Sequence, residues 1–201
     1  MDEFVLPKTA DLLTSARACL SNASSTLNDA NLLMSRRRYH RAYALAILAQ
    51  EEFAKCFILC TCALQPRWDV EIWKALSQHE RKQALVEVMD RYVNWFAQHN
   101  SFALRLNASA LIPAPVNYTP DPEVFTTWSS EIRKRIINKR SIDSSKQRAL
   151  YVAIGKNGKV SSEPSCTEEQ VAAQLQKAIT FQKVTDKQLK HIVGGVFGVG
   201  A

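Results

Sequence analysis

Glycine is scarce in this chain of 201 residues, which has only six, four of them at positions 194, 195, 198 and 200. A turn-rich β architecture uses glycine where the backbone must adopt a positive φ, so this scarcity favours helices. The hydrophobic fraction of 46% is too high for a disordered chain. The length fits one domain with a buried core.

The chain also lacks every common cysteine signature. It has no Cys-x-x-Cys pair and no Cys/His set with zinc spacing. We therefore expect no metal and no cofactor, and we expect free thiols of the kind found in a reducing cytoplasm. The five cysteines are Cys19, Cys56, Cys60, Cys62 and Cys166.

No signal peptide is expected, because the first 20 residues contain three acidic residues and no continuous apolar run. Residues 42–64 form an apolar run long enough to span a bilayer. Glu51, Glu52 and Lys55 near its midpoint argue against insertion, since each central charge costs a few kcal/mol in a membrane. We expect a buried helix, a cytoplasmic protein and no membrane partner.

Hydrophobic periodicity predicts a mainly all-α fold. The expected segments are helices at 8–37, 41–64, 70–106 with Asp69 as N-cap, and 123–149, a hairpin near 150–161, and a last helix at 168–192 opened by a capping box at Thr167. Four prolines between 113 and 122 predict a linker or loop at 107–122. Residues 1–106 would form the helical core, and 123–201 would complete the same domain.

The net charge of +7 permits binding to nucleic acid or to an acidic partner without establishing either. Two basic clusters are candidates for RNA binding, or are solvated helix faces. They comprise Arg36, Arg37 and Arg38, and Arg133, Lys134 and Arg135.

The charges inside the apolar run at 42–64 need partners, because a buried charge is costly unless it is paired. Glu51 and Lys55 are four residues apart and can pair along one helix face. Glu52 is expected in apolar surroundings, with His79, Lys82 or Arg148 as partner. The set is either a lock that fixes helix register or a site for RNA or another phosphate-bearing ligand.

Three blocks of this sequence resemble AbiV-type abortive infection proteins of the HEPN superfamily. The first block contains Asp29-Ala30, Leu32-Leu33, Tyr39 and the Ala-rich run to Glu51-Glu52 and Lys55. The second block contains Trp73, His79 and Lys82. The third block is the run 146–152, with Arg148 and Tyr151. The blocks occur in the expected order and cover about residues 28–155. The departure is Phe53-Ala54, where the family commonly has Leu-Gly.

The resemblance implies a HEPN-like antiparallel helical bundle and antiphage defence, in which infected cells stop growing before phage are released. The protein would act by binding a phage or host component. It also implies a homodimer, a phage protein as trigger, and RNA or the translation machinery as possible targets. The alternatives are a metal-independent ribonuclease toxin and a non-catalytic adaptor or antitoxin.

The ribonuclease alternative depends on an Arg-x(4–6)-His motif, which this sequence does not contain. Arg91 and His99 are separated by seven residues, and Arg36 and His40 by three. His79 has no arginine at the required distance before it. Ribonuclease activity is therefore not carried over, and His79, His99 and Arg91 remain only candidates for catalysis.

Overall fold

The computed structural model describes residues 5–64, 68–106, 146, 149–154, 156–162 and 165–197. Within these ranges the side chains of 79–80, 95–106, 153, 161–162 and 195–197 are not described. The elements are α1 (Thr9–Ser35), α2 (Tyr39–Leu64), α3 (Val70–Ser77), α4 (His79–Leu106), β1 (Ala153–Ile154), β2 (Val160–Ser162) and α7 (Glu168–Phe197). The mainly α-helical fold predicted from the sequence is confirmed.

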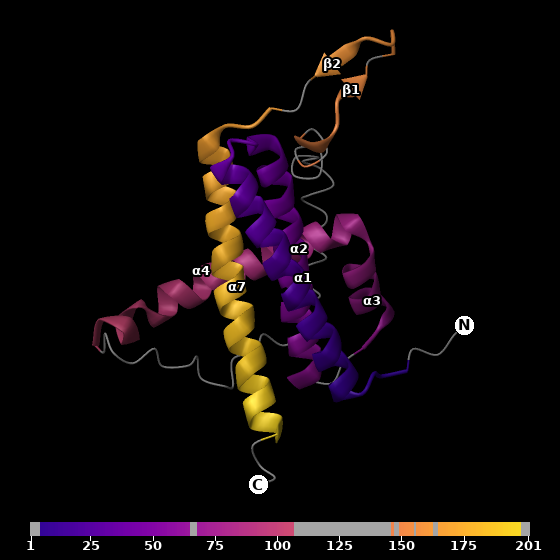
Figure 1. Ribbon diagram of the computed structural model, residues 1–201. Coiled ribbons are helices and arrows are strands. Elements are labelled where there is room, and N and C mark those ends of the chain that lie inside the picture. The colour runs from indigo at the N-terminus through magenta and orange to yellow at the C-terminus, as the bar shows by residue number, and fades with distance from the viewer. Residues whose placement is uncertain are drawn as a thin grey trace.

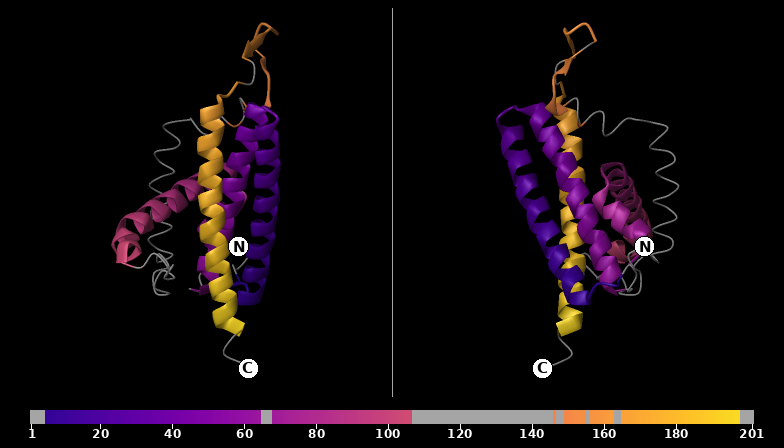
Figure 2. Two further views of the ribbon diagram at one scale, coloured as in Figure 1. Left: turned by 60° about the vertical axis from the view of Figure 1, so that its left-hand side comes forward. Right: turned by 90° about the vertical axis from the view of Figure 1, so that its right-hand side faces the viewer.

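Three long helices, α1, α2 and α7, lie side by side and form the bundle (Figure 1, Figure 2). A short turn at Arg36–Arg38 connects α1 to α2, so these two helices are antiparallel. Helix α7 begins at the same end of the bundle as α2 and runs parallel to it. Helix α4 crosses the bundle at a steep angle, and its C-terminal half extends away from it.

Small side chains allow α1 and α2 to pack closely. Ala16, Ala23 and Ala30, spaced seven residues apart on α1, are fully buried. They face an α2 whose buried residues also include many alanines. Aromatic rings fill the wider spaces of the core, where Phe57 of α2 lies 5.0 Å from the ring of Tyr92 in α4, centroid to centroid.

The helix predicted at 70–106 is broken in two. Asp69 caps α3 as expected, and its Oδ1 accepts hydrogen bonds from the backbone N–H groups of Glu71 and Ile72 at 2.9 Å. At Gln78 the backbone becomes extended, with φ −89° and ψ 130°. The break lets α3 fold back on α4, where Arg81 forms an ion pair with Glu71 and holds the pKa of that carboxyl below its usual value.

The predicted hairpin is present, with β1 and β2 antiparallel and Ile154 opposite Val160. Gly158 has φ +74° in the turn, a conformation that glycine adopts without strain. The hairpin projects beyond the end of the bundle at which α2 and α7 begin (Figure 1). The predicted linker at 107–122 and most of the predicted helix at 123–149 lie outside the described residues.

The capping box predicted before the last helix is formed. Thr167 N–H donates to Gln170 Oε1 at 3.0 Å, and Gln170 N–H donates to Thr167 Oγ1 at 3.3 Å. Helix α7 continues to Phe197, past the expected end at 192. In the described part of the chain, every helix is too short or too polar to cross a membrane.

Close packing between α1 and α2 predicts a different response to the same enlargement at two positions of α1. Ala23→Leu forces a larger side chain into the α1–α2 contact and should lower the free energy of unfolding by about 1–3 kcal/mol. Ala18→Leu, at an exposed position of the same helix, should change it by less than about 0.5 kcal/mol. Urea unfolding followed by circular dichroism measures both. Equal effects of the two substitutions would contradict the packing described.

Candidate functional site

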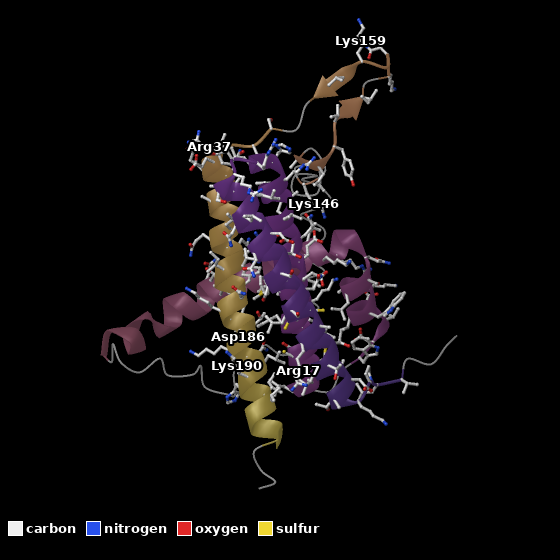
Figure 3. The ribbon with its side chains drawn as sticks, in the orientation of Figure 1. Arg17, Arg37, Lys146, Lys159, Asp186 and Lys190 are labelled. Atoms are coloured by element: carbon white, nitrogen blue, oxygen red, sulfur yellow. The ribbon has the colours of Figure 1, made fainter. Side chains whose placement is uncertain are left out.

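Glu51, in the middle of α2, is the centre of the charged network. It is buried, and its Oε1 lies 2.9 Å from Nζ of Lys146. The two side chains are only 3% and 7% exposed. At this depth a carboxylate and an ammonium are tolerated only as a pair, because either charge alone would lose its hydration without compensation. Figure 3 shows Lys146 close to the half of the bundle nearer the hairpin.

Helix α4 contributes Gln83 to the same network. Its Nε2 lies 3.5 Å from Oε1 of Glu51, at the long end of hydrogen-bond distances. The other amide atom, Oε1, is buried without a hydrogen-bond partner among the described residues. The Glu51–Lys146 pair therefore joins α2 and the 146 segment, with α4 packed beside it.

Glu52 and Lys55 form a second ion pair one turn along α2. Their side chains are 21% and 17% exposed, so this pair is half-buried and within reach of solvent. The thiol of Cys19 on α1 lies next to it. Burial and the neighbouring Glu52 carboxylate raise the pKa of Cys19 to about 11, while Lys55 opposes the shift.

Lys82 of α4 completes the half-buried part of the network. Burial, together with repulsion from the Lys55 ammonium, lowers its pKa, while Glu51 and Glu52 act in the opposite direction. Three lysines and two glutamates therefore meet where α2, α4 and the 146 segment converge. Among the described residues, no group of three or more His, Cys, Asp and Glu side chains is placed to hold a metal ion.

The pairing differs from the sequence expectation. Lys55 pairs with Glu52 rather than Glu51, and Glu51, not Glu52, is the more buried carboxylate. The rotation of α2 about its axis decides this, because adjacent helical residues point about 100° apart. Sequence reasoning missed Lys146 and Gln83 as members of the site. The signal for Lys146 was its place as the first residue of the third block of resemblance.

Of the three catalytic candidates, the structure describes the side chain of Arg91 alone. Arg91 lies on the surface of α4, and its Nη2 is 3.5 Å from Oε1 of Glu87. His79 and His99 belong to α4, but their side chains lie outside the described set. No prediction that involves those two imidazoles is tested here.

The remaining predicted residues lie on the surface or outside the described residues. Tyr151 is 67% exposed, so it takes no part in the buried network. Arg36, Arg37 and Arg38 are exposed in the α1–α2 turn. Arg148, Arg133, Lys134 and Arg135 lie outside the described residues.

Polar contacts on another side of α2 attach α7. Gln50 Nε2 donates to the backbone oxygen and to Oε1 of Gln174, both at 2.9 Å. At the helix starts, Tyr39 Oη donates to Glu168 Oε2 at 2.7 Å, which raises the pKa of Tyr39. Both contacts follow from the parallel arrangement of α2 and α7.

The sequence model of the HEPN_AbiV family, described as AbiV, matches residues 11–182, which include the whole charged network. The chain belongs to the AbiV family of HEPN proteins. Membership of this AbiV family implies a role in defence of the abortive-infection type. No curated protein and no solved structure matches the chain significantly.

The buried pair of this AbiV protein predicts an asymmetric mutational response. Lys146→Met leaves the Glu51 carboxylate buried without its paired ammonium and should lower the free energy of unfolding by about 3–5 kcal/mol. The double variant Glu51→Met/Lys146→Met removes both charges and should be more stable than Lys146→Met alone. Lys190→Met, at a side chain that is 76% exposed, is the control. Urea unfolding measures all three, and a double variant less stable than Lys146→Met would contradict the buried pairing.

The thiol of Cys19 reports on the charge of Glu52. With a pKa of about 11, the thiolate fraction, and with it the rate of alkylation by iodoacetamide, should rise about tenfold per unit between pH 7 and 10. Glu52→Gln removes a negative neighbour, so it should lower the pKa and speed the reaction at any pH in this range. The comparison uses a Cys166→Ser background, with Glu87→Gln as control. An unchanged rate in Glu52→Gln would show that Glu52 does not face Cys19.

Proposed function

We propose that this AbiV protein stops the growth of phage-infected cells by binding a phage or host component. In this proposal the charged network holds the helices together and does not itself bind the partner. The observation that carries the proposal is the burial of Glu51 with Lys146. A carboxylate that is 3% exposed and paired to an ammonium has no access to a substrate and serves to hold helices together. Binding would then take place on the surface of the bundle.

The positions of the basic residues support binding over catalysis. The sequence contains no Arg-x(4–6)-His, and Arg91 is a surface residue paired with Glu87. The exposed cluster Arg36–Arg38 gives the α1–α2 turn a positive charge suited to an acidic partner or to RNA. The partner would be a phage protein or part of the translation machinery, met in the cytoplasm by a homodimer of this chain.

The test is a phage challenge of bacteria that produce the protein. We expect fewer plaques and arrested growth of infected cells. In a separate assay with a chelator present, the purified protein should not cleave RNA. His79→Ala and His99→Ala should protect as well as the parent chain, because binding does not require an imidazole base. Lys146→Met should protect less well, because the loss of its buried pair lowers the population of folded protein.

Two results would overturn the proposal. Full phage growth in producing cells would exclude the defence role of this chain. RNA cleavage by the purified protein that is lost in a folded His79→Ala or His99→Ala variant would establish the ribonuclease alternative instead.

A further inference from the structure

The hairpin carries an apolar surface that nothing in the described structure covers. Val152, Ile154 and Val160 are 51%, 61% and 56% exposed, and Tyr151 is 67% exposed. Ile154 and Val160 are register partners, so their side chains lie on the same face of the hairpin. Val152 lies just before β1 and is exposed as well, next to the register shift between Ala153 and Ile154. Clustered exposed apolar residues of this kind mark interaction sites more often than single ones do.

The strands themselves are open for pairing. Within the described residues the sheet consists of β1 and β2 alone, so each strand has one edge without a neighbouring strand. An isolated two-stranded hairpin is marginally stable in water and gains both hydrogen bonds and apolar contact from a third strand. An extended segment of another protein can supply these by strand addition.

The charge of the hairpin indicates the kind of segment. Residues 150–162 contain Lys156 and Lys159 and no Asp or Glu, and both lysines are exposed. Lys159 lies at the tip of the hairpin, which extends from the end of the bundle where Arg37 is also found (Figure 3). At this end of the molecule the exposed basic residues Arg36–Arg38, Lys156 and Lys159 outnumber the exposed Glu168 and Glu169 at the start of α7, and complementary charge would favour an acidic partner.

Two other occupants fit less well. A two-fold pairing of hairpins from two copies of the chain would give Lys156 and Lys159 no partner of opposite charge, since residues 150–162 contain no Asp or Glu. Single-stranded RNA is bound mainly by stacking on aromatic side chains, whereas this face is formed by Val and Ile, with Tyr151 as the one aromatic side chain in residues 150–162.

We propose that the hairpin of β1 and β2 is the docking site for an extended, acidic and apolar segment of a partner protein. The segment adds a strand to the hairpin, covers Ile154 and Val160, and pairs its carboxylates with Lys156 and Lys159. This inference rests on the proposed function and names the class of partner through which that function would operate.

The test uses the full chain and a fluorescein-labelled peptide in which Val and Ile alternate with Glu, followed by fluorescence anisotropy. The parent chain should bind this peptide, and a matched peptide with Lys in place of Glu should not bind. Lys156→Glu/Lys159→Glu and, separately, Ile154→Ser/Val160→Ser should weaken binding by more than about tenfold. These residues lie outside the core, so urea unfolding should confirm that both variants remain folded.

A charge-matched control separates the hairpin from the general positive charge of the protein. Lys183→Glu/Lys187→Glu reverses two exposed lysines on α7 and, like the hairpin variant, takes the net charge from +7 to +3. It should leave peptide binding unchanged. Equal weakening in this control, no binding by the parent chain, or preferred binding of a mixed-sequence RNA oligonucleotide would overturn the proposal. Sedimentation gives a further test. If the hairpin variants dissociate from dimer to monomer and still bind the peptide, the hairpin is a dimer contact and the proposal is overturned.

Phage challenge of the same variants distinguishes the two proposals. If the hairpin variants protect cells as well as the parent chain, the hairpin is not the docking site and the proposed function stands. If the parent chain binds the acidic peptide through the hairpin but gives no protection, the proposed function fails and the docking site stands.

Discussion

One buried ion pair constrains the rest of this structure. Glu51 is buried in the middle of α2, and its charge is compensated by Lys146, which is 95 residues further along the chain. The polypeptide must therefore return to the middle of α2 after all of α4 and the segment that follows it. The hairpin starts a few residues after Lys146, and α7 then runs along α2 and parallel to it. β1 begins seven residues after Lys146, and the hairpin projects beyond the end of the bundle (Figure 1).

The sequence predicts well those features that depend on neighbouring residues. The apolar periodicity of α1 and α2, the Asp69 cap and the Thr167–Gln170 capping box are all local, and the structure contains each of them. The break at Gln78 was missed because neither Gly nor Pro marks it. The hydroxyl of Ser77 donates to the carbonyl of Trp73 at 2.9 Å, but Thr61 and Thr185 make the same bond inside helices that continue, so this bond does not mark a helix end.

The site was harder to predict than the fold, because its pairing depends on a rotation. Glu51 and Glu52 are adjacent in an apolar run, and nothing local says which of them faces the core. The contact of Glu51 with Lys146 requires the arrangement of three distant segments, and an amphipathic pattern gives no information about that arrangement. Hydrophobic periodicity thus locates the helix that carries the site, whereas the choice between two neighbouring carboxylates belongs to tertiary packing.

The residues of the family signature range from fully buried to largely exposed. Their burial distinguishes residues that pack in the core from residues that lie on the surface. Glu51 is buried, Glu52 and Lys55 are half-buried, and Tyr151 is 67% exposed. A role in packing accounts for Glu51 and partly for Glu52 and Lys55. The exposed side chain of Tyr151 contributes little to stability. The hairpin that follows Tyr151 has two short strands, and the described residues add no third strand to it. Elements of low local stability are the ones a partner can order at small cost to the fold. A helical bundle that holds a buried ion pair and presents a hairpin of two short strands therefore suits the strand addition proposed above, in which the binding energy completes a sheet and the core stays unchanged.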